Sequence, residues 1–223
     1  MRYKLAGMLA TIAAVAATPA AAGEDVAYWQ NLNLTIKASE EIRITSETSL
    51  RSSDARGFYQ LQQVTMIGFK PSKKVTLWAG YVHTPQYSKG DFTVMERRFR
   101  QQINVDDVAK IGSLNLGLRV RTEQRWRDGI AGTGWRLRPS VRASAPLPAK
   151  LRLNLAHESF INLNTTGFQR QSGYERMRNS VGVTIPFSKA VGFELGYINQ
   201  WSIVRGGPDN IDHVVNTTIS ASF

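Results

Sequence analysis

The feature that most constrains this chain is a two-residue alternation of apolar and polar side chains, which runs from Val26 to the last residue. This period is typical of β-strands, and no long helical period interrupts it. The chain has no cysteine, so disulfides cannot hold the fold. The pattern therefore predicts an all-β protein that depends on backbone hydrogen bonds and packing. The final segment illustrates it, with one face formed by Val215, Thr217, Ile219, Ala221 and Phe223.

Clusters of Gly, Pro, Asn, Asp and Ser divide the alternating region into eleven expected strands, with short turns and longer loops taking turns between them. Long strands joined in this way are typical of outer-membrane barrels, and single-chain bacterial barrels have even strand numbers. We therefore expect an antiparallel up-and-down transmembrane β-barrel of 10–12 strands, with the place of the first segment left open. The expected strands span 26–38, 41–51, 58–70, 75–83, 92–105, 113–127, 135–146, 151–163, 174–187, 191–203 and 212–223.

The N-terminus has the pattern of a secretory signal peptide. Arg2 and Lys4 precede an apolar run at 5–17, and small residues at 18–22 favour cleavage after Ala22. The run is shorter than the roughly 20 residues that a membrane-spanning helix needs. We expect residues 1–22 to be removed, leaving a barrel domain of residues 23–223 with 26 basic and 17 acidic side chains.

The C-terminal Phe223, at the end of an alternating strand, resembles the signal by which the barrel-assembly machinery recognises outer-membrane proteins. The resemblance implies the outer membrane of a Gram-negative bacterium, with outer-membrane lipid, lipopolysaccharide and that machinery as partners. We expect a monomer. The competing interpretation is a soluble periplasmic β-sandwich binding protein, because soluble antiparallel sheets alternate as well.

Arginines gather on the polar faces of the expected strands, where they would line the lumen of a barrel. One interpretation is an ion-paired plug, since small barrels have interiors filled by side chains. The other is a narrow passage for small anions, since a cationic wall concentrates them. The lumen arginines are Arg98, Arg100, Arg119, Arg121, Arg125, Arg136, Arg138, Arg142, Arg176 and Arg178, and the carboxylates in the same phase are Glu47, Glu96, Glu123, Glu158 and Glu194.

Three stretches carry a family resemblance: Met-Glu-Arg-Arg-Phe-Arg-Gln-Gln at 95–102, Arg-x-Arg-x-Glu-x-Arg at 119–125, and His-Glu-Ser-Phe at 157–160. Together they resemble a family of bacterial outer-membrane β-barrels that is catalogued as a domain of unknown function. The resemblance covers essentially the whole chain after residue 22. It implies location and fold, and it assigns no role to any residue.

An enzyme is the remaining alternative, because some small outer-membrane barrels hydrolyse lipids with a His and Ser pair and an acidic or amide partner. His157 and Ser159 would share the outward face of one strand. Against this, Glu158 would face inward and no Gly-x-Ser-x-Gly context surrounds Ser159, so we expect no enzyme and read His157 as an interfacial histidine near a strand end. Scattered histidines and inward arginines likewise predict no metal, no cofactor and no nucleic acid.

Overall fold

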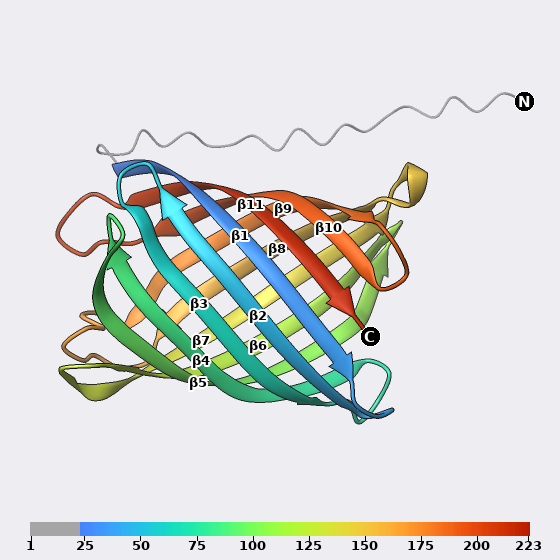
Figure 1. Cartoon of the computed structure of the whole chain (residues 1–223), viewed down its shortest axis with the longest axis horizontal. Helices are drawn as coiled ribbons and strands as arrows, with labels where there is room; N and C mark the ends of the chain where they lie inside the picture. Colours follow the sequence, from blue (N-terminus) through green and yellow to red (C-terminus); the bar gives the residue numbers. More distant parts are fainter. Residues whose placement is uncertain (1–22) are drawn as a thin grey trace, which may run out of the picture.

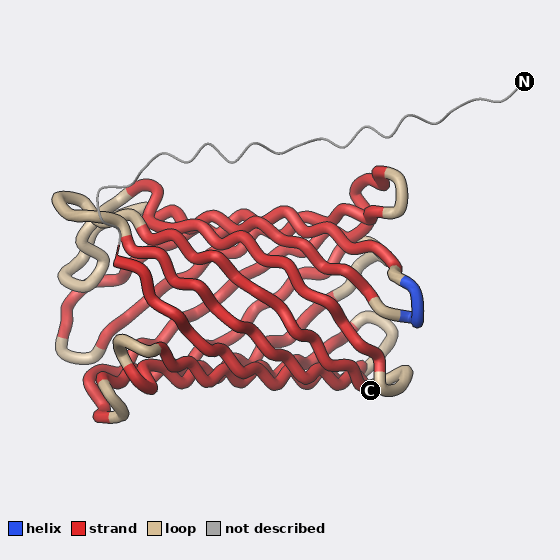
Figure 2. The backbone as a smooth tube through the Cα atoms, turned by 90° about the horizontal axis from the view of Figure 1, so that it is seen from above, coloured by secondary structure: helices blue, strands red, loops and turns tan. Residues whose placement is uncertain are grey.

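A computed structural model describes residues 23–223, which form one closed β-barrel (Figures 1 and 2). The expected signal peptide at 1–22 lies outside the described residues. The eleven strands are β1 Gly23–Lys37, β2 Ile42–Ser53, β3 Gly57–Phe69, β4 Val75–Ser88, β5 Asp91–Ile111, β6 Leu114–Arg127, β7 Ile130–Pro146, β8 Arg152–Asn162, β9 Gly173–Pro186, β10 Val191–Ser202 and β11 Asn210–Ser222. The expected all-β barrel of 10–12 strands is confirmed.

The barrel closes with an odd number of strands, and this corrects the expectation of an even number. Each strand pairs antiparallel with its sequence neighbours, whereas β1 and β11 pair in parallel from Gly23↔Asn210 to Thr35↔Ser222. A parallel pair is the only way to close a meander of eleven strands, because its first and last strands run in the same direction. Beyond this seam, the Phe223 N–H donates a backbone hydrogen bond to Thr35.

The two ends of the barrel differ in their connections. The turn end carries the connections at 38–41, 70–74, 112–113, 147–151 and 187–190, together with Phe223, and the loop end carries 54–56, 89–90, 128–129, 163–172, 203–209 and Gly23. The expected strand bounds agree with these within a few residues, except where β4, β5 and β7 continue into segments expected to be loops or turns. The only helical segment of residues 23–223 is a single 3-10 turn, Pro148–Lys150.

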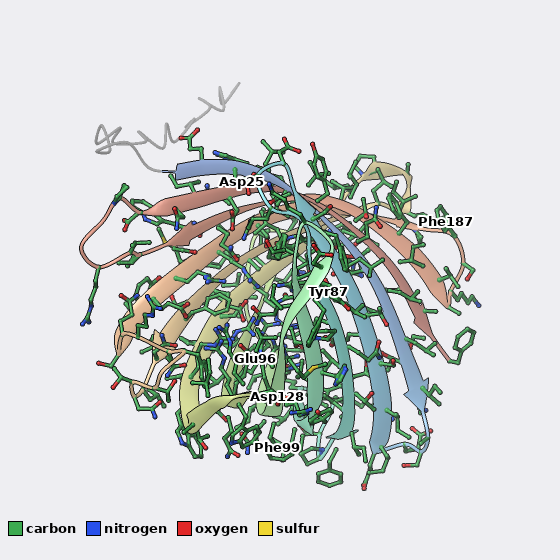
Figure 3. The ribbon with its side chains drawn as sticks, turned by 60° about the vertical axis from the view of Figure 1, so that its left-hand side comes forward. Asp25, Tyr87, Glu96, Phe99, Asp128 and Phe187 are labelled. Carbon is green, nitrogen blue, oxygen red and sulfur yellow. The ribbon has the colours of Figure 1, made fainter. Side chains whose placement is uncertain are left out.

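Apolar and polar side chains are distributed inside out relative to a water-soluble protein. Among the described residues, 34 large apolar side chains are exposed, only eight apolar residues are buried, and 21 polar or charged residues are buried. Figure 3 shows the contrast, with Glu96 inside the barrel and Phe99 and Phe187 projecting from its outer surface. Within residues 23–223, no helix is long and apolar enough to cross a membrane.

The interior is not polar throughout. Trp78 packs inside the barrel against the buried side chains of Val64, Met66 and Val82. The indole of Trp78 fits because Gly68 lies opposite on β3, where a Cβ would come within 2.7 Å of the ring. A second apolar cluster joins Ala27, Trp29 and Val214 near the seam. Most of the other buried side chains are polar or charged.

Candidate functional site

The candidate site is the interior of the barrel, where three buried glutamates are each surrounded by arginines. The first is Glu96, which is fully buried on β5. It accepts hydrogen bonds from Nε of Arg98 at 2.6 Å, Nε of Arg125 at 3.0 Å and Nε of Arg127 at 2.8 Å. Strand pairing positions these donors, because Glu96 lies opposite Arg127 and Arg98 lies opposite Arg125 across β5 and β6.

The second carboxylate, Glu123 on β6, is also fully buried and joins three strands. It accepts hydrogen bonds from Nη2 of Arg100 at 3.0 Å, Nη2 of Arg136 at 2.5 Å and Nη1 of Arg138 at 3.0 Å. Arg100 comes from β5, and Arg136 and Arg138 come from β7. Charge-assisted hydrogen bonds of this kind are the strong ones, so Glu123 fixes all three guanidinium groups.

The third carboxylate, Glu158 on β8, extends the cluster to the next strand. It accepts hydrogen bonds from Nη2 of Arg138 at 2.9 Å and Nη2 of Arg119 at 2.7 Å. Arg138 therefore bridges Glu123 and Glu158, and Arg98 lies between Glu96 and Glu123, 3.8 Å from the latter. We call the three glutamates with Arg98, Arg100, Arg119, Arg125, Arg127, Arg136 and Arg138 the arginine lattice.

The remaining predicted lumen residues lie around this lattice. Arg121 donates to Oε1 of Gln102, and Arg142 pairs with Asp106. Glu194 accepts hydrogen bonds from the Asn154 amide and the Thr184 hydroxyl. Arg176 pairs with Glu175, and Glu47 lies 3.8 Å from Arg100 across the interior. Arg178 donates to Oε1 of Gln200 and lies 4.0 Å from Glu158.

Cavities open on both sides of the lattice. The loop-end cavity has a volume of about 660 Å³ and is lined by ten arginines and five carboxylates. The turn-end cavity has a volume of about 520 Å³, and Gln102, Asn104 and Arg121 are among its lining residues. Between them, Arg100, Glu123 and Phe160 are at most 1% exposed. Side chains are therefore tightly packed at this level, on the part of the wall formed by β5 to β8.

Arginines at the loop-end cavity also stack on aromatic rings, which the sequence analysis did not anticipate. The Arg51 guanidinium lies 4.0 Å from the Trp29 ring centroid, and Arg178 lies 4.6 Å from it. Arg138 lies 4.3 Å from the Phe160 centroid. Cations are attracted to ring faces in this geometry. The inward phase of Trp29 and Arg51 could be found from the alternation, but their contact depends on the pairing of β1 with β2.

A second candidate site lies on the outside of the barrel, between β8 and β9. His157 and Asn179 are opposite each other in the register, and the His157 Nδ1 lies 2.7 Å from the Asn179 Oδ1. The His157 Nε2 lies 3.0 Å from the Ser159 hydroxyl, which lies 3.1 Å from the Tyr174 hydroxyl. The sequence indicated the first pair of this cluster, His157 and Ser159, and missed Asn179 and Tyr174 because the length of the 163–172 loop concealed the register.

His157 does not lie near a strand end, since β8 continues five residues beyond it on either side. No group of three or more His, Cys, Asp or Glu side chains within residues 23–223 is placed to hold a metal ion. Glu158 faces the interior, so the amide of Asn179 takes the place that an acidic partner would have beside His157.

Comparison with known proteins gives a family but no activity. Residues 26–211 match the family described as "Protein of unknown function (DUF2490)". A protein of Methylorubrum extorquens that is described only as uncharacterized is 27% identical over 222 residues, which cover 97% of this chain and 94% of the relative. No solved structure matches. The chain therefore belongs to the family of unknown function DUF2490.

Proposed function

We propose that this protein is an integral outer-membrane barrel of a Gram-negative bacterium whose interior is closed by the arginine lattice. The observation that carries the proposal is the inside-out distribution of side chains, with 34 large apolar residues exposed and 21 polar or charged residues buried. A closed barrel also pairs the backbone groups that lipid cannot solvate. In this environment the apolar exterior is stable and the charged interior is shielded from lipid.

Strand length and aromatic positions support the same proposal. A transmembrane strand needs about 9–11 residues, and the strands here have 11–21. Most exposed aromatic side chains lie toward the two ends, as expected for residues at the two interfaces of a membrane, while Tyr81, Phe99 and Tyr197 lie in the middle of their strands. Those toward the loop end are Tyr28, Trp126, Trp135, Tyr174 and Trp201, and those toward the turn end are Phe69, Phe187 and Phe223.

Membrane fractionation tests the location. We expect the protein to be released only by detergent and to migrate faster on a gel before boiling than after it. Release with the soluble periplasmic contents would overturn the proposal and favour a soluble sheet protein. Labelling with a membrane-impermeant maleimide tests which end of the barrel faces the outside of the cell. Ala55→Cys at the loop end should react on intact cells, whereas Lys73→Cys at the turn end should not.

Planar-bilayer recordings test whether the interior is closed. We expect the refolded barrel to give no steady current, because the lattice leaves Arg100, Glu123 and Phe160 at most 1% exposed between the two cavities. The double variant Glu123→Gln with Glu158→Gln should conduct anions, since the remaining guanidinium groups then repel one another. Glu40→Gln, in an exposed turn, is the matched control. A steady current through the unaltered barrel would contradict the closed interior.

A second candidate function is a passage for small anions, favoured by the charges that line the loop-end cavity. The loop-end cavity carries twice as many arginines as carboxylates, and Arg51 forms no ion pair among residues 23–223. If the unaltered barrel does conduct, the reversal potential under a salt gradient should show selectivity for anions, and Arg51→Gln should weaken it.

A further inference from the structure

The outward cluster of His157, Ser159, Asn179 and Tyr174 has a hydrogen-bond order that defines the roles of its members. The His157 Nδ1 faces the Asn179 carbonyl oxygen, which only accepts hydrogen bonds. Nδ1 must therefore carry the proton and donate it. The His157 Nε2 is then left with a lone pair that faces the Ser159 hydroxyl at 3.0 Å. This is the arrangement in which a neutral imidazole activates a serine.

The cluster differs from the other polar contacts on the outside of the barrel. Thr48 donates to Gln63, and Thr122 donates to Gln101, so these contacts pair a hydroxyl with an amide. A third contact joins the Tyr197 hydroxyl to Nδ1 of His213. Across residues 23–223, Ser159 is the one serine that contacts a histidine ring. Nothing in barrel architecture requires a bound serine, histidine and asparagine on an outward face.

The position of the cluster fits the ester bonds of membrane lipids. Tyr174 belongs to the outward aromatic residues of the loop end, and its hydroxyl contacts Ser159. Such aromatic residues lie at the level of lipid headgroups, and Tyr174 is opposite Ile161, so Ser159 lies on the acyl-chain side of that level, toward the ester bonds. A β-bulge at Glu175 on β9, opposite the step from Phe160 to Ile161, places Tyr174 on the outer face. Bulges often occur next to active sites, where they redirect side chains.

We propose that Ser159 and His157 are the catalytic residues of a lipid-facing ester hydrolase, with Asn179 as the positioning residue, whose substrates are acyl esters of outer-membrane lipids. The inference rests on the proposed outer-membrane location. The charged lattice inside the barrel takes no part in it, so the interior and the outer surface have separate roles.

The geometry defines a two-step reaction. The Ser159 oxygen forms a bond to the ester carbonyl carbon while its proton passes to the His157 Nε2. The bond from that carbon to the lipid alcohol then breaks, and the alcohol leaves with the proton from Nε2. Water completes the second step: it loses a proton to Nε2, attacks the acyl-serine and releases a fatty acid, and the proton returns to the Ser159 oxygen.

Covalent labelling tests the serine directly. A long-chain alkyl fluorophosphonate should modify folded protein in mixed micelles, and mass spectrometry should place the adduct on Ser159. Ser159→Ala and His157→Ala should both lose the label, while Ser46→Ala, which removes another outward serine, and His213→Ala should keep it. Absence of label on Ser159 in protein that shows the heat-dependent gel shift would overturn the site. Absence of the gel shift itself would instead contradict the barrel in the membrane.

Fatty-acid release distinguishes the source of the ester. Phospholipid micelles and purified lipopolysaccharide are offered separately, and the released fatty acids are measured by mass spectrometry. We expect release from at least one substrate and a loss of about 100-fold or more in Ser159→Ala and His157→Ala, the range typical of a lost catalytic base. Release from neither substrate, or equal release by the unaltered protein and Ser159→Ala, would overturn the proposal.

The role of Asn179 has its own readout. Asn179→Ala should lower kcat more than KM, because His157 loses the group that fixes its orientation. Asn179→Asp should restore much of kcat and move the pH of half-maximal activity upward, since a carboxylate stabilises the charged imidazole. A purely structural role would leave this pH unchanged, and that result would remove Asn179 from the site.

Discussion

Glu123 illustrates how a carboxylate is tolerated when it has no exposed surface. Its two oxygens accept hydrogen bonds from Arg100, Arg136 and Arg138, so both its charge and its acceptor capacity are satisfied. Buried ion pairs contribute little net stability when complete, but loss of one partner leaves buried charges uncompensated. Arg100 and Arg136 therefore depend on Glu123 more than on any other group in the lattice, whereas Arg138 also donates two hydrogen bonds to Glu158.

Glu123→Gln should consequently destabilise the barrel by about 3–5 kcal/mol, the range for a broken buried pair. Urea unfolding of the refolded protein, followed by tryptophan fluorescence, measures the change in the free energy of unfolding. The control is Glu40→Gln, whose side chain is 89% exposed, and it should change stability by less than about 0.5 kcal/mol. An equal, small effect of both variants would mean that the lattice is not held by its carboxylates.

At this scale the sequence predicts which way a side chain points but not what it touches. The two-residue period placed Arg138 and Glu158 on the same polar phase. Whether Arg138 meets Glu158, Glu123 or both depends on the register of β6, β7 and β8, which the alternation does not contain. For the same reason the sequence did not predict the contact between Asn179 and His157, which follows from the register of β8 with β9.

The strands themselves were largely predictable, and the exceptions have local causes. β4 continues to Ser88 although Pro85 lies within it, and Pro usually indicates a strand edge or an end. The chain then reverses through Lys89 and Gly90, both with positive φ, in a two-residue turn typical of hairpins. The glycine and proline of this region predicted a loop. The strand continues instead, because pairing with β5 offsets the cost of these residues.

Packing between strands is most tightly constrained where β3 and β4 meet. Gly68→Ala should destabilise the barrel by about 1–3 kcal/mol, the usual cost of overpacking, because the added Cβ would lie 2.7 Å from the Trp78 ring. Urea unfolding measures this loss. Gly192→Ala is the matched control, because a Cβ added there would lie 3.5 Å from its nearest neighbour, the Thr184 methyl carbon. In the background of Trp78→Leu, the Gly68→Ala change should cost much less, and an unchanged cost would show that the indole is not responsible.

The whole molecule depends on how the barrel closes. The sequence indicated eleven segments, but the even strand number of bacterial barrels argued against that count. Strand number could be read from local alternation, whereas closure is a relation between the two ends of the chain. The parallel pairing of β1 with β11 resolves the conflict and places Gly23 and Phe223 at opposite ends of the barrel.

Cysteine cross-linking tests the seam in a chain that has no cysteine of its own. Leu32→Cys with Ile219→Cys should cross-link on oxidation, because these outward residues are opposite each other in the parallel register. Leu32→Cys with Leu195→Cys is the control and should not cross-link, since β11 separates β1 from β10. If β1 instead lay outside a ten-stranded barrel, β2 would pair with β11, and Leu50→Cys would cross-link with a cysteine on β11. That result would overturn the eleven-stranded closure, while cross-linking of the first pair alone would establish that the seam forms in the folded protein.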